Sequence, residues 1–398
     1  MPLVVHITTV PASLVFLDGQ VAFMRERGFE VVAISSPGPE LDAFGQRESV
    51  RVVGVPMPRR ITPLRDLASV LRLWRTLTDL SPDIVHAHTP KGGLLGMIAG
   101  TMAGVPVRIY HMRGLPLMTA TGLRAVLLTA TEKVSCALAH EVLCVSHSLR
   151  EVALERGLCP PDRIRVLGAG SGQGVDARGR FDPARSAGER ARVRAELGIP
   201  SDALVYGFVG RIVRDKGIVE LAEAWQRVRE EVPSAHLILA GVREAKDPVP
   251  ASTMGMFERD PRVHELGFCG DTPALYSALD VVVLPTYREG FPNVPLEAAA
   301  MGIPVIATRI PGCVDAVLDG ETSILVAPRN ASDLAAAMEH YAAEPELRAR
   351  HGQAGRHRAL HEFDRPRVWS RIADLYDRTL ECAGHAPARD AHSAVGAA

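Results

Sequence analysis

The sequence predicts an α/β protein made of two doubly wound halves, each with a parallel sheet between layers of helices. Short β-branched stretches recur along the chain with helical patterns between them, which is typical of βαβ units. The series breaks once, at a stretch rich in glycine and charge, and then starts again. With 398 residues the chain is long enough for two domains of about 100 to 200 residues each.

The order of the elements follows from these stretches. In the first half, the predicted strands are 3–8, 30–35, 50–55, 83–88, 107–111 and 141–146. In the second half, they are 204–210, 235–241, 263–268, 280–285, 304–308 and 323–327. Helices are expected between successive strands.

The stretch between the halves, Gly168–Ala191, is rich in Gly, Ser and charge and poor in apolar periodicity, as linkers are. Its alternating glycines are reminiscent of a dinucleotide-binding loop, but that loop must open a helix directly, and polar residues follow here. The tail after Glu381 has no amphipathic pattern, so we expect it to be disordered. The predicted organisation is an N-terminal domain at 1–172, a linker at 173–191, a C-terminal domain at 192–366, a helix at about 367–382 that packs back on the first domain, and a disordered tail at 383–398.

Composition and charge argue against several classes of protein. The chain has 45 Lys and Arg against 46 Asp and Glu, so no overall positive field favours nucleic acid. No basic segment followed by an apolar run opens the chain, and the weakly polar run Gly92–Val107 is too short to span a bilayer. The six cysteines form no C-x-x-C pair, which argues against a disulfide framework and a zinc site. We expect a cytoplasmic protein.

A candidate anion site follows the first strand of the second half. The strand runs into Gly210 and a loop with Arg211 and Lys216, and a helix opens near Gly217. A helix N-terminus with a planar guanidinium and an ammonium suits a diphosphate. The alternative is an ordinary loop that carries two solvated basic residues, and this segment alone slightly favours it.

A second candidate site contains two glutamates that lie eight residues apart. We expect a helix at about Pro295–Met301 with Asn293 as its N-cap, so that Glu297 lies in the first turn, where the helix dipole favours an acid. Glu289 precedes the cap and has no such explanation. Both candidate sites lie at carboxyl ends of strands, where open α/β sheets bind ligands. Carboxylates accept hydrogen bonds from hydroxyl pairs, so a diphosphate site beside them indicates a sugar nucleotide.

Three motifs resemble family four of the retaining glycosyltransferases: VGRIVRDKG (209–217), EGFPNVPLE (289–297) and HTPKGGLLG (88–96). The resemblance runs from about Leu3 to Asp377, and within the family it is strongest to bacterial enzymes of capsule and exopolysaccharide assembly. It implies the GT-B fold, in which two Rossmann-like domains face each other across a cleft.

The resemblance also implies roles for individual residues. Arg211 and Lys216 would bind the donor diphosphate, Glu297 the ribose, and Glu289 the donor sugar. The catalytic set would be Arg211, Lys216, Glu289 and His111. The donor site would comprise Gly210, Arg211, Lys216, Gly267, Phe268, Glu289, Gly290, Phe291, Asn293, Val294 and Glu297.

The implied activity is metal-independent transfer of a sugar, a hexose or an N-acetylhexosamine, with retention. The donor would be a nucleoside diphosphate sugar, UDP-linked, and the acceptor a hydroxyl or amine of a small-molecule, carrier-bound or lipid-linked acceptor in glycan or natural-product biosynthesis. No cofactor is expected. The alternatives are a nucleotide-sugar epimerase or phosphorylase of the same fold, or a non-catalytic nucleotide-sugar binding protein. The donor sugar, its base, the acceptor and the oligomeric state stay open.

The N-terminal half departs from the family pattern. Arg113 occupies the position where many members have a histidine that contacts the donor sugar, and His111 lies two residues earlier, so the assignment between them is open. The double glycine after the first strand is missing, although Ser13 could open a helix there. The acceptor-side residues would be Ser13, His88, Lys91 and Arg113.

Two further features of this half have two interpretations each. His86 and His88 have a spacing that a metal could use, but no acid or third histidine lies near them in sequence, so we expect no metal. The stretch Pro58–Leu77 predicts a basic amphipathic helix, which either covers the sheet or makes peripheral contact with an anionic membrane. The sheet-covering interpretation is favoured. Its apolar face would contain Leu64, Leu67, Val70, Leu71, Trp74 and Leu77.

Overall fold

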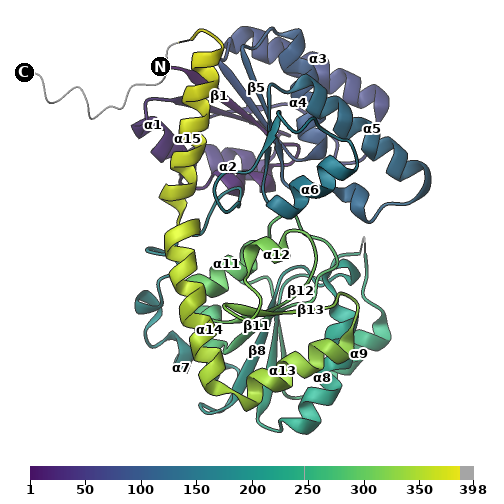
Figure 1. Cartoon of the computed structure of the whole chain (residues 1–398), viewed down its shortest axis with the longest axis vertical. Coiled ribbons are helices and arrows are strands. Elements are labelled where there is room, and N and C mark those ends of the chain that lie inside the picture. The colour runs from purple at the N-terminus through teal and green to yellow at the C-terminus, as the bar shows by residue number, and fades with distance from the viewer. Residues whose placement is uncertain (246, 386–398) are drawn as a thin grey trace, which may run out of the picture. The chain divides into compact units, whose positions relative to one another are not determined.

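The structure, a computed structural model, describes residues 1–245 and 247–385 (Figure 1). The chain folds into two compact units. The first contains residues 1–173 and the C-terminal segment from Pro366, and the second contains Gly174–Arg365. Most of the predicted tail, 383–398, lies outside the described residues.

The first unit contains a parallel sheet with the strand order β3-β2-β1-β4-β5-β6-β7. Its strands are β1 (Leu3–Ile7), β2 (Glu30–Ser35), β3 (Arg51–Gly54), β4 (Ile84–His88), β5 (Val107–Met112), β6 (Glu141–Cys144) and β7 (Ile164–Arg165). Its helices are α1 (Gln20–Glu26), α2 (Pro39–Arg47), α3 (Pro63–Leu80), α4 (Pro90–Met102), α5 (Gly122–Leu138), α6 (His147–Glu155) and nearly all of α15 (Arg365–Cys382), with 3-10 helices at Pro11–Leu17 and Pro116–Met118.

The second unit contains a parallel sheet with the order β10-β9-β8-β11-β12-β13. Its strands are β8 (Leu204–Val209), β9 (Ala235–Ala240), β10 (Val263–Gly267), β11 (Val281–Leu284), β12 (Val305–Thr308) and β13 (Ser323–Val326). Its helices are α7 (Glu189–Glu196), α8 (Ile218–Glu231), α9 (Ala251–Glu258), α10 (Thr272–Ala278), α11 (Asn293–Ala300), α12 (Cys313–Ala316), α13 (Ala331–Ala343) and α14 (Pro345–Arg358). Shorter helical turns lie at Pro183–Ser186, Arg214–Lys216 and Ala359–Phe363.

The predicted α/β class and the predicted strands are confirmed, with strand ends that agree to one or two residues. The sequence did not predict β7, which has only two residues and therefore no readable alternation. The segment predicted as a linker, 173–191, lies almost wholly in the second unit, where its last part, including α7, packs on α10. Some of its polar residues make local bonds: Asp176 accepts from the amide of Arg180 at 2.8 Å. Composition alone does not distinguish such a hydrogen-bonded segment from a free linker.

Each sheet has a point where the winding direction reverses, between β1 and β4 in the first unit and between β8 and β11 in the second. Loops at the carboxyl ends of the strands on either side of such a point form the usual ligand crevice of open α/β sheets. In the first unit, α15 contributes Val368, Ile372 and Tyr376 to the core that also contains Val4 of β1. Helices α3, α4 and α5 pack against one another in sequence, and Figure 1 shows them on the opposite side of the sheet from α15. None of the described helices is long and apolar enough to cross a membrane.

Candidate functional site

The loops after β8 and β11 meet at the winding reversal of the second sheet. Gly217 lies between the turn Arg214–Lys216 and α8, with a φ of 72°. A Cβ on Gly217 would lie 1.9 Å from the carbonyl oxygen of Pro285, so only glycine allows this approach. The amide of Tyr287 donates to the carbonyl of Asp215 at 2.9 Å and joins the two loops further.

The contact between these loops brings Lys216 and Glu289 together. Lys216 Nζ makes an ion pair with Glu289 Oε1, and the two side chains are only 16% and 15% exposed. Beside them, Arg288 Nη2 lies 2.9 Å from Asp215 Oδ2, a second ion pair between the same two loops. An ammonium and a carboxylate held side by side at this place offer one group to a phosphate and one to sugar hydroxyls.

Arg211 is not part of this contact. Its guanidinium pairs with Glu244, with 2.9 Å between Nη1 and Oε2, and the side chain is 45% exposed. Gly210 has a φ of 149°, and its carbonyl lies so close to Gly241 that a Cβ there would come within 1.7 Å of it. The two residues predicted to bind the diphosphate therefore lie in different surroundings: Lys216 is largely buried in an ion pair, and Arg211 is on the surface.

A third loop, which follows β12, reaches the same place. Gly312 has a φ of 85°, and a Cβ there would lie 2.5 Å from the carbonyl oxygen of Gly290. Cys313 is buried next to it, where desolvation and then the Glu289 carboxylate raise the pKa of the thiol. Gly312 is not among the residues that the sequence predicts for the site. The Pro-Gly pair directly after a predicted strand was the available signal.

The prediction for Glu297 was wrong in its reason. Helix α11 begins at Asn293, and Pro292 is the N-cap, with no side-chain cap bond. Asn293 is therefore the first helical residue and not the cap, and Glu297 lies beyond the first turn. Pro292 suits the N-cap position, because its ring fixes φ near the observed −74°. Its ψ of 135° is extended and not helical, so the helix starts at the next residue.

Glu297 is instead held by Tyr276, a residue that the sequence analysis missed. The Tyr276 hydroxyl donates to Glu297 Oε2 at 2.9 Å. Burial raises the pKa of Glu297, and the bond from Tyr276 partly offsets that rise. The hydroxyl belongs to α10 and lies 21 residues away in sequence, so no local pattern indicates it.

The remaining predicted donor residues lie in different surroundings. Phe291 packs on Phe363 with 5.5 Å between ring centroids, while Val294 is partly buried in the first turn of α11. Gly267 has a φ of 66° at the end of β10, and Phe268 after it is 82% exposed. Because β9 separates β10 from β8, this last pair follows the edge strand of the sheet, away from the winding reversal.

In the first unit, four buried histidines line one side of the sheet and form two hydrogen-bonded chains. His86 Nδ1 lies 2.6 Å from the Tyr376 hydroxyl, and His86 Nε2 lies 3.1 Å from His111 Nδ1. His6 Nδ1 lies 2.9 Å from His88 Nε2. His111 Nε2 has no hydrogen-bond partner among the described residues.

Arg113 closes the second chain. Its Nε donates to His88 Nδ1 at 3.1 Å, so His88 carries its proton on Nε2 and donates to His6. Its Nη2 donates to the carbonyl of Gly172 at 3.2 Å, and its guanidinium lies 4.2 Å from the centroid of the Phe16 ring. Burial lowers the pKa of Arg113 to about 9, which still leaves it charged at neutral pH.

The arrangement of these histidines bears on the prediction that the protein binds no metal, because three of them lie close together. No third histidine lies near His86 and His88 in the sequence, but β1 supplies His6, and candidate ligand atoms of the three lie within 4.8 Å of one another. Two observations disfavour a cation there. The facing nitrogens of His6 and His88 already bond to each other, and the charged Arg113 bonds to His88. The absence of a metal stays a prediction.

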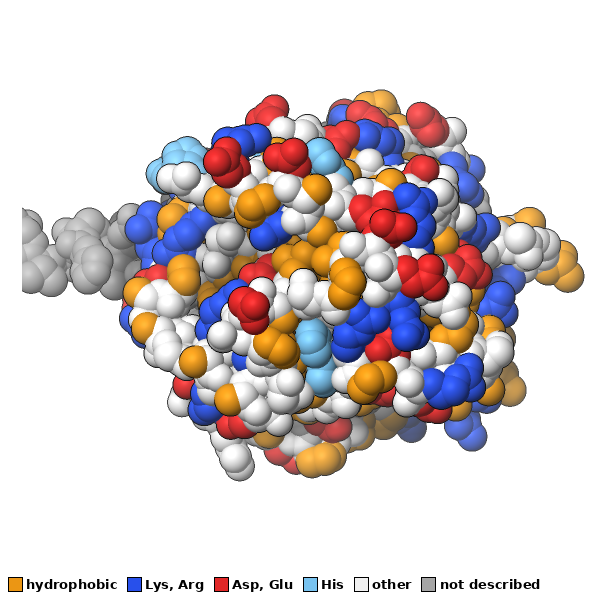
Figure 2. Space-filling view, turned by 90° about the horizontal axis from the view of Figure 1, so that it is seen from below, with side chains coloured by type: hydrophobic (Ala, Val, Ile, Leu, Met, Phe, Trp, Pro, Cys, Tyr) orange, Lys and Arg blue, Asp and Glu red, His pale blue; other side chains and the backbone are white. Residues whose placement is uncertain are grey.

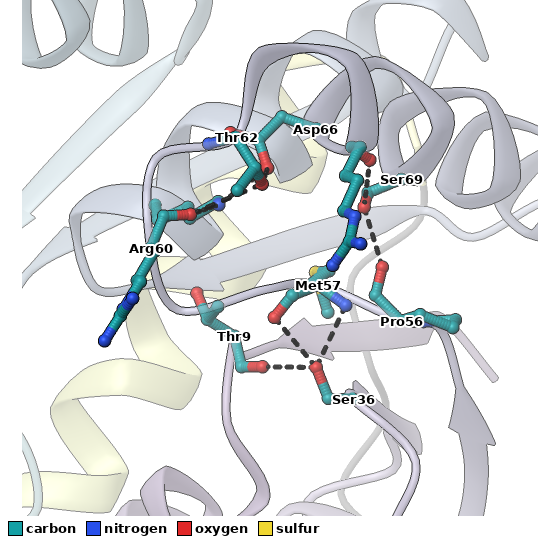
Figure 3. A network of polar contacts seen from close by, with 10 residues as sticks. Thr9, Ser36, Pro56, Met57, Arg60, Thr62, Asp66 and Ser69 are labelled. Atoms are coloured by element: carbon teal, nitrogen blue, oxygen red, sulfur yellow. Dashed lines mark hydrogen bonds and ion pairs between the residues drawn. The ribbon is translucent and has the colours of Figure 1, made fainter.

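The other predicted acceptor-side residues make structural contacts. Ser13 lies in the 3-10 helix Pro11–Leu17, and its amide, expected to be free for a ligand, donates to the carbonyl of Val10 at 3.0 Å. Lys91 pairs with Asp66, with 2.6 Å between Nζ and Oδ1. Asp66 also accepts from Thr62, in the network that fixes the start of α3 (Figure 3).

Comparison with known proteins supports the family resemblance. Residues 203–344 match the model of the glycosyl transferases group 1, and residues 15–170 match that of a glycosyl transferase 4-like domain. The chain is 32% identical over 376 residues to the capsular polysaccharide biosynthesis glycosyltransferase CapM of Staphylococcus aureus, covering 94% of this chain and 97% of that protein. It is 29% identical to a UDP-Gal:alpha-D-GlcNAc-diphosphoundecaprenol alpha-1,3-galactosyltransferase of Escherichia coli, over 67% of this chain and 68% of that protein.

Solved structures agree on the fold. HepE of Anabaena in complex with UDP superposes with a TM-score of 0.76 at 21% identity, covering 94% of this chain and 99% of that one. A sucrose-phosphate synthase from Thermosynechococcus elongatus gives a TM-score of 0.78 at 21% identity, covering 96% and 100%. With two Rossmann-like units and a relative that matches over almost its whole length, the chain belongs to the group 1 glycosyltransferases, family four, and has the GT-B fold.

Proposed function

We propose that the protein transfers a hexose or N-acetylhexosamine from a UDP-sugar to a hydroxyl of a lipid-linked acceptor, with retention and without a metal. The observation that supports this most is the ion pair of Lys216 with Glu289 at the winding reversal of the second sheet. It combines a cation for the diphosphate with a carboxylate for the transferred sugar.

The chemistry assigned to these residues is electrostatic. Lys216, with Arg211, neutralises the diphosphate as the bond from the anomeric carbon to the phosphate oxygen breaks. The acceptor oxygen bonds to the anomeric carbon on the same face, and its proton passes to the departing phosphate. Glu289 faces an ammonium and therefore acts as a hydrogen-bond acceptor for sugar hydroxyls and not as an acid. A phosphate leaving group needs little protonation, so no glycosidase-type acid is required.

Glu297 is assigned to the ribose of the donor. Its carboxylate is oriented by Tyr276 and keeps one oxygen for a ligand, since the tyrosine bond uses Oε2. We also assign to the donor site the residues of the loop before α11 and of its first turn, which lie between Glu289 and Glu297: Gly290, Phe291, Asn293 and Val294. Gly267 and Phe268 stay assigned to the donor site on the resemblance alone.

Of the two candidates at the carboxyl end of β5, Arg113 suits a ligand better than His111. His111 is buried inside the sheet and bonds to His86, whereas Arg113 lies just beyond the strand, is partly exposed, and has N–H groups beyond those already bonded. We assign His111 to the support of His86 and the contact with substrate to Arg113.

The donor and acceptor classes rest on relatives. The structural neighbour from Anabaena is a complex with UDP, and relatives from Escherichia coli and Campylobacter jejuni are named for transfer to diphospho-undecaprenol-linked sugars. The expected cytoplasmic location and the absence of nucleic-acid partners stay predictions.

Diphosphate release from candidate UDP-, GDP- and dTDP-sugars, with and without an undecaprenyl diphosphate sugar acceptor, tests the assignment. Lys216→Ala and Glu289→Ala should each lower kcat/KM by about 100-fold or more, as loss of preorganised charge does. Arg227→Ala is the matched control, because Arg227 pairs with Glu339 on the surface of the same unit. Unchanged turnover in both site variants would overturn the site.

Product analysis separates the alternatives. Nuclear magnetic resonance of the product should show the anomeric configuration of the donor, and turnover should persist in excess EDTA. An isomerised nucleotide sugar without diphosphate release would identify an epimerase instead. Tight UDP-sugar binding without any product would identify a binding protein.

A further inference from the structure

The N-terminus of helix α4 lies at the winding reversal of the first sheet. The helix begins with a proline directly after β4, and the loop after β1 lies on the other side of the reversal. Proline has no amide hydrogen, and the amides of Lys91 and Gly92 donate to no other described residue. The first bonded amide is that of Gly93, which donates to the carbonyl of Thr89 at 2.7 Å. The start of α4 therefore offers two free N–H groups to a ligand.

Thr89 precedes this helix but does not cap it. A threonine at the N-cap usually accepts a hydrogen bond from one of the first amides through its side chain. Thr89 makes no such bond in the part of the chain that the structure describes, and its φ of 67° is unfavourable for a β-branched residue. The residue best suited to satisfy the free amides of α4 thus leaves them open.

Thr9, in the loop after β1, supplies the observation that indicates a ligand. Its side chain is buried, with 6% of the residue exposed, and Oγ1 has no hydrogen-bond partner among the described residues. Such a hydroxyl is destabilising, and valine would fill the same space without that cost. The hydroxyl faces the start of α4, because a Cβ on Gly92 would lie 3.3 Å from Thr9 Oγ1, from the Thr9 amide nitrogen and from Thr89 Oγ1.

Both sides of this place are held firmly. Ser36 Oγ bonds to the carbonyl of Thr9 at 2.8 Å and accepts from the amide of Met57 at 3.0 Å (Figure 3). On the other side, Lys91 Nζ bonds to the carbonyl of Arg60 at 2.5 Å. The carbonyl of Thr9 is thus used within the protein while its hydroxyl is not, and the free donors are fixed before any ligand arrives.

The groups that surround this place are donors and cations. Neither α4 nor the stretch 8–17 contains an acid, and Asp66, which contacts α4, is neutralised by Lys91 with 2.6 Å between Oδ1 and Nζ. Arg113 adds a positive charge through its bond to His88, the last residue of β4. Composition does not explain this, because the chain has 46 Asp and Glu, and acidic and basic side chains are intermingled on the face shown in Figure 2. Donors without acceptors suit an anion, whereas a neutral sugar also needs acceptors for its hydroxyl hydrogens.

We propose that the N-terminus of α4 and the hydroxyl of Thr9 bind the diphosphate that joins the acceptor's sugar to its lipid. The amides of Lys91 and Gly92 and the Thr9 hydroxyl donate to phosphate oxygens, and the helix dipole favours their negative charge. The identity of the anion rests on the proposed function, in which the acceptor is lipid-linked, while the site itself rests on the free donors. It is separate from the donor site, which lies in the second unit.

Binding of geranyl diphosphate tests this without the transfer reaction. Saturating UDP is present so that the donor site is occupied. Isothermal titration calorimetry should show binding of geranyl diphosphate but not of geraniol, which has the same chain without the diphosphate. Thr9→Val should bind about tenfold or more weakly, because a hydrogen bond to a charged group contributes that much. Thr9→Ser keeps the hydroxyl and should bind as the wild type does. Lys216→Ala should also bind as the wild type does, so failure of this proposal and failure of the proposed function are distinguishable.

Two glycines of α4 provide a matched pair of variants. Gly92→Ala places a methyl group between the hydroxyls of Thr9 and Thr89 and should weaken binding of geranyl diphosphate. Gly100→Ala should not, because a Cβ there lies 3.3 Å from Cδ of Arg108, a flexible side chain that can move.

The stability of Thr9→Val is a second readout. Urea unfolding should show a variant at least as stable as the wild type, because the substitution removes a buried hydroxyl without a partner. A loss of stability would assign the hydroxyl to the fold and overturn the proposal. So would a Thr9→Val variant that binds geranyl diphosphate as tightly as the wild type, or a wild-type protein that binds it only when UDP is absent.

Discussion

Replacing Gly217 with alanine tests whether the loops after β8 and β11 must approach as closely as the structure shows. The new Cβ would lie 1.9 Å from the carbonyl oxygen of Pro285, whereas real Cβ atoms stay beyond 3.0 Å. The loops would therefore have to separate by about 1.1 Å, a displacement of backbone that no flexible side chain can absorb. Lys216 directly precedes this position, and Glu289 follows Pro285 in the facing loop.

Two contributions make up the expected loss in the free energy of unfolding. A φ of 72° costs a residue with a Cβ about 1–2 kcal/mol, and forcing packed backbone apart costs about 1–3 kcal/mol more. We expect Gly217→Ala to destabilise the second unit by about 2–5 kcal/mol. A misplacement of about 1 Å between catalytic groups can cost about 100-fold in rate, so kcat/KM should fall by that order.

Gly320→Ala is the matched control. Gly320 also has a φ of 72°, but a Cβ there meets nothing within 4 Å. It therefore reports the backbone strain without the clash. Hydrogen exchange measured by mass spectrometry should show faster exchange in peptides that cover both loops in Gly217→Ala only. Equal exchange and equal kcat/KM in the two variants would refute the reasoning.

Other expectations follow from single contacts. Tyr276→Phe removes the bond to Glu297, and because bonds to charged groups contribute about 1.5–3 kcal/mol, KM for the donor should rise about tenfold or more with kcat less affected. Glu132 has a pKa raised to about 7 by burial, so its contribution to stability is present below its ordinary value of 4.5 and is lost as pH rises through 7. Urea unfolding should show that Glu132→Gln, which keeps an acceptor for Tyr110, removes a pH dependence of about 3 kcal/mol across this range; an unchanged slope would contradict the assignment.

Local signals in the sequence were sufficient for the fold. Each predicted strand is a run of β-branched residues between turn residues, and a parallel sheet buried on both sides requires such runs. The two-residue strand β7 offers no such run. The hydrogen-bonded segment that follows Gly174 has the composition of a linker, because Gly, Ser and charged residues also suit tight turns.

The sequence predicted Lys216, Glu289 and Glu297 for the candidate site, but it indicated neither Tyr276 nor Gly312, and none of the contacts between these residues. Lys216 and Glu289 were both expected in the donor site, yet they are 73 residues apart and sequence alone does not show that they touch. The same holds for Glu297, whose partner Tyr276 belongs to another helix. Helical periodicity placed Leu64 and Leu67 of α3 on one face with Val70 and Leu77, and this prediction was wrong, because the structure buries Val70 and Leu77 and leaves Leu64 and Leu67 exposed.

The two winding reversals differ in the ionisable side chains that lie beside them: an ion pair in the second unit, and buried neutral histidines in the first. In the second unit, Lys216 and Glu289 form an ion pair at the reversal. In the first unit, burial lowers the pKa of His6 to about 3 and also lowers those of His86, His88 and His111, and the charge of Arg113 lowers them further. The histidines are thus neutral at physiological pH, and protonating any of them would place a second positive charge beside Arg113. Stability from this cluster is therefore present above the ordinary histidine pKa of 6.5 and is lost as the pH falls below it. Because Tyr376 on α15 bonds to His86, the C-terminal helix helps to fix the orientation of the cluster from which Arg113 extends.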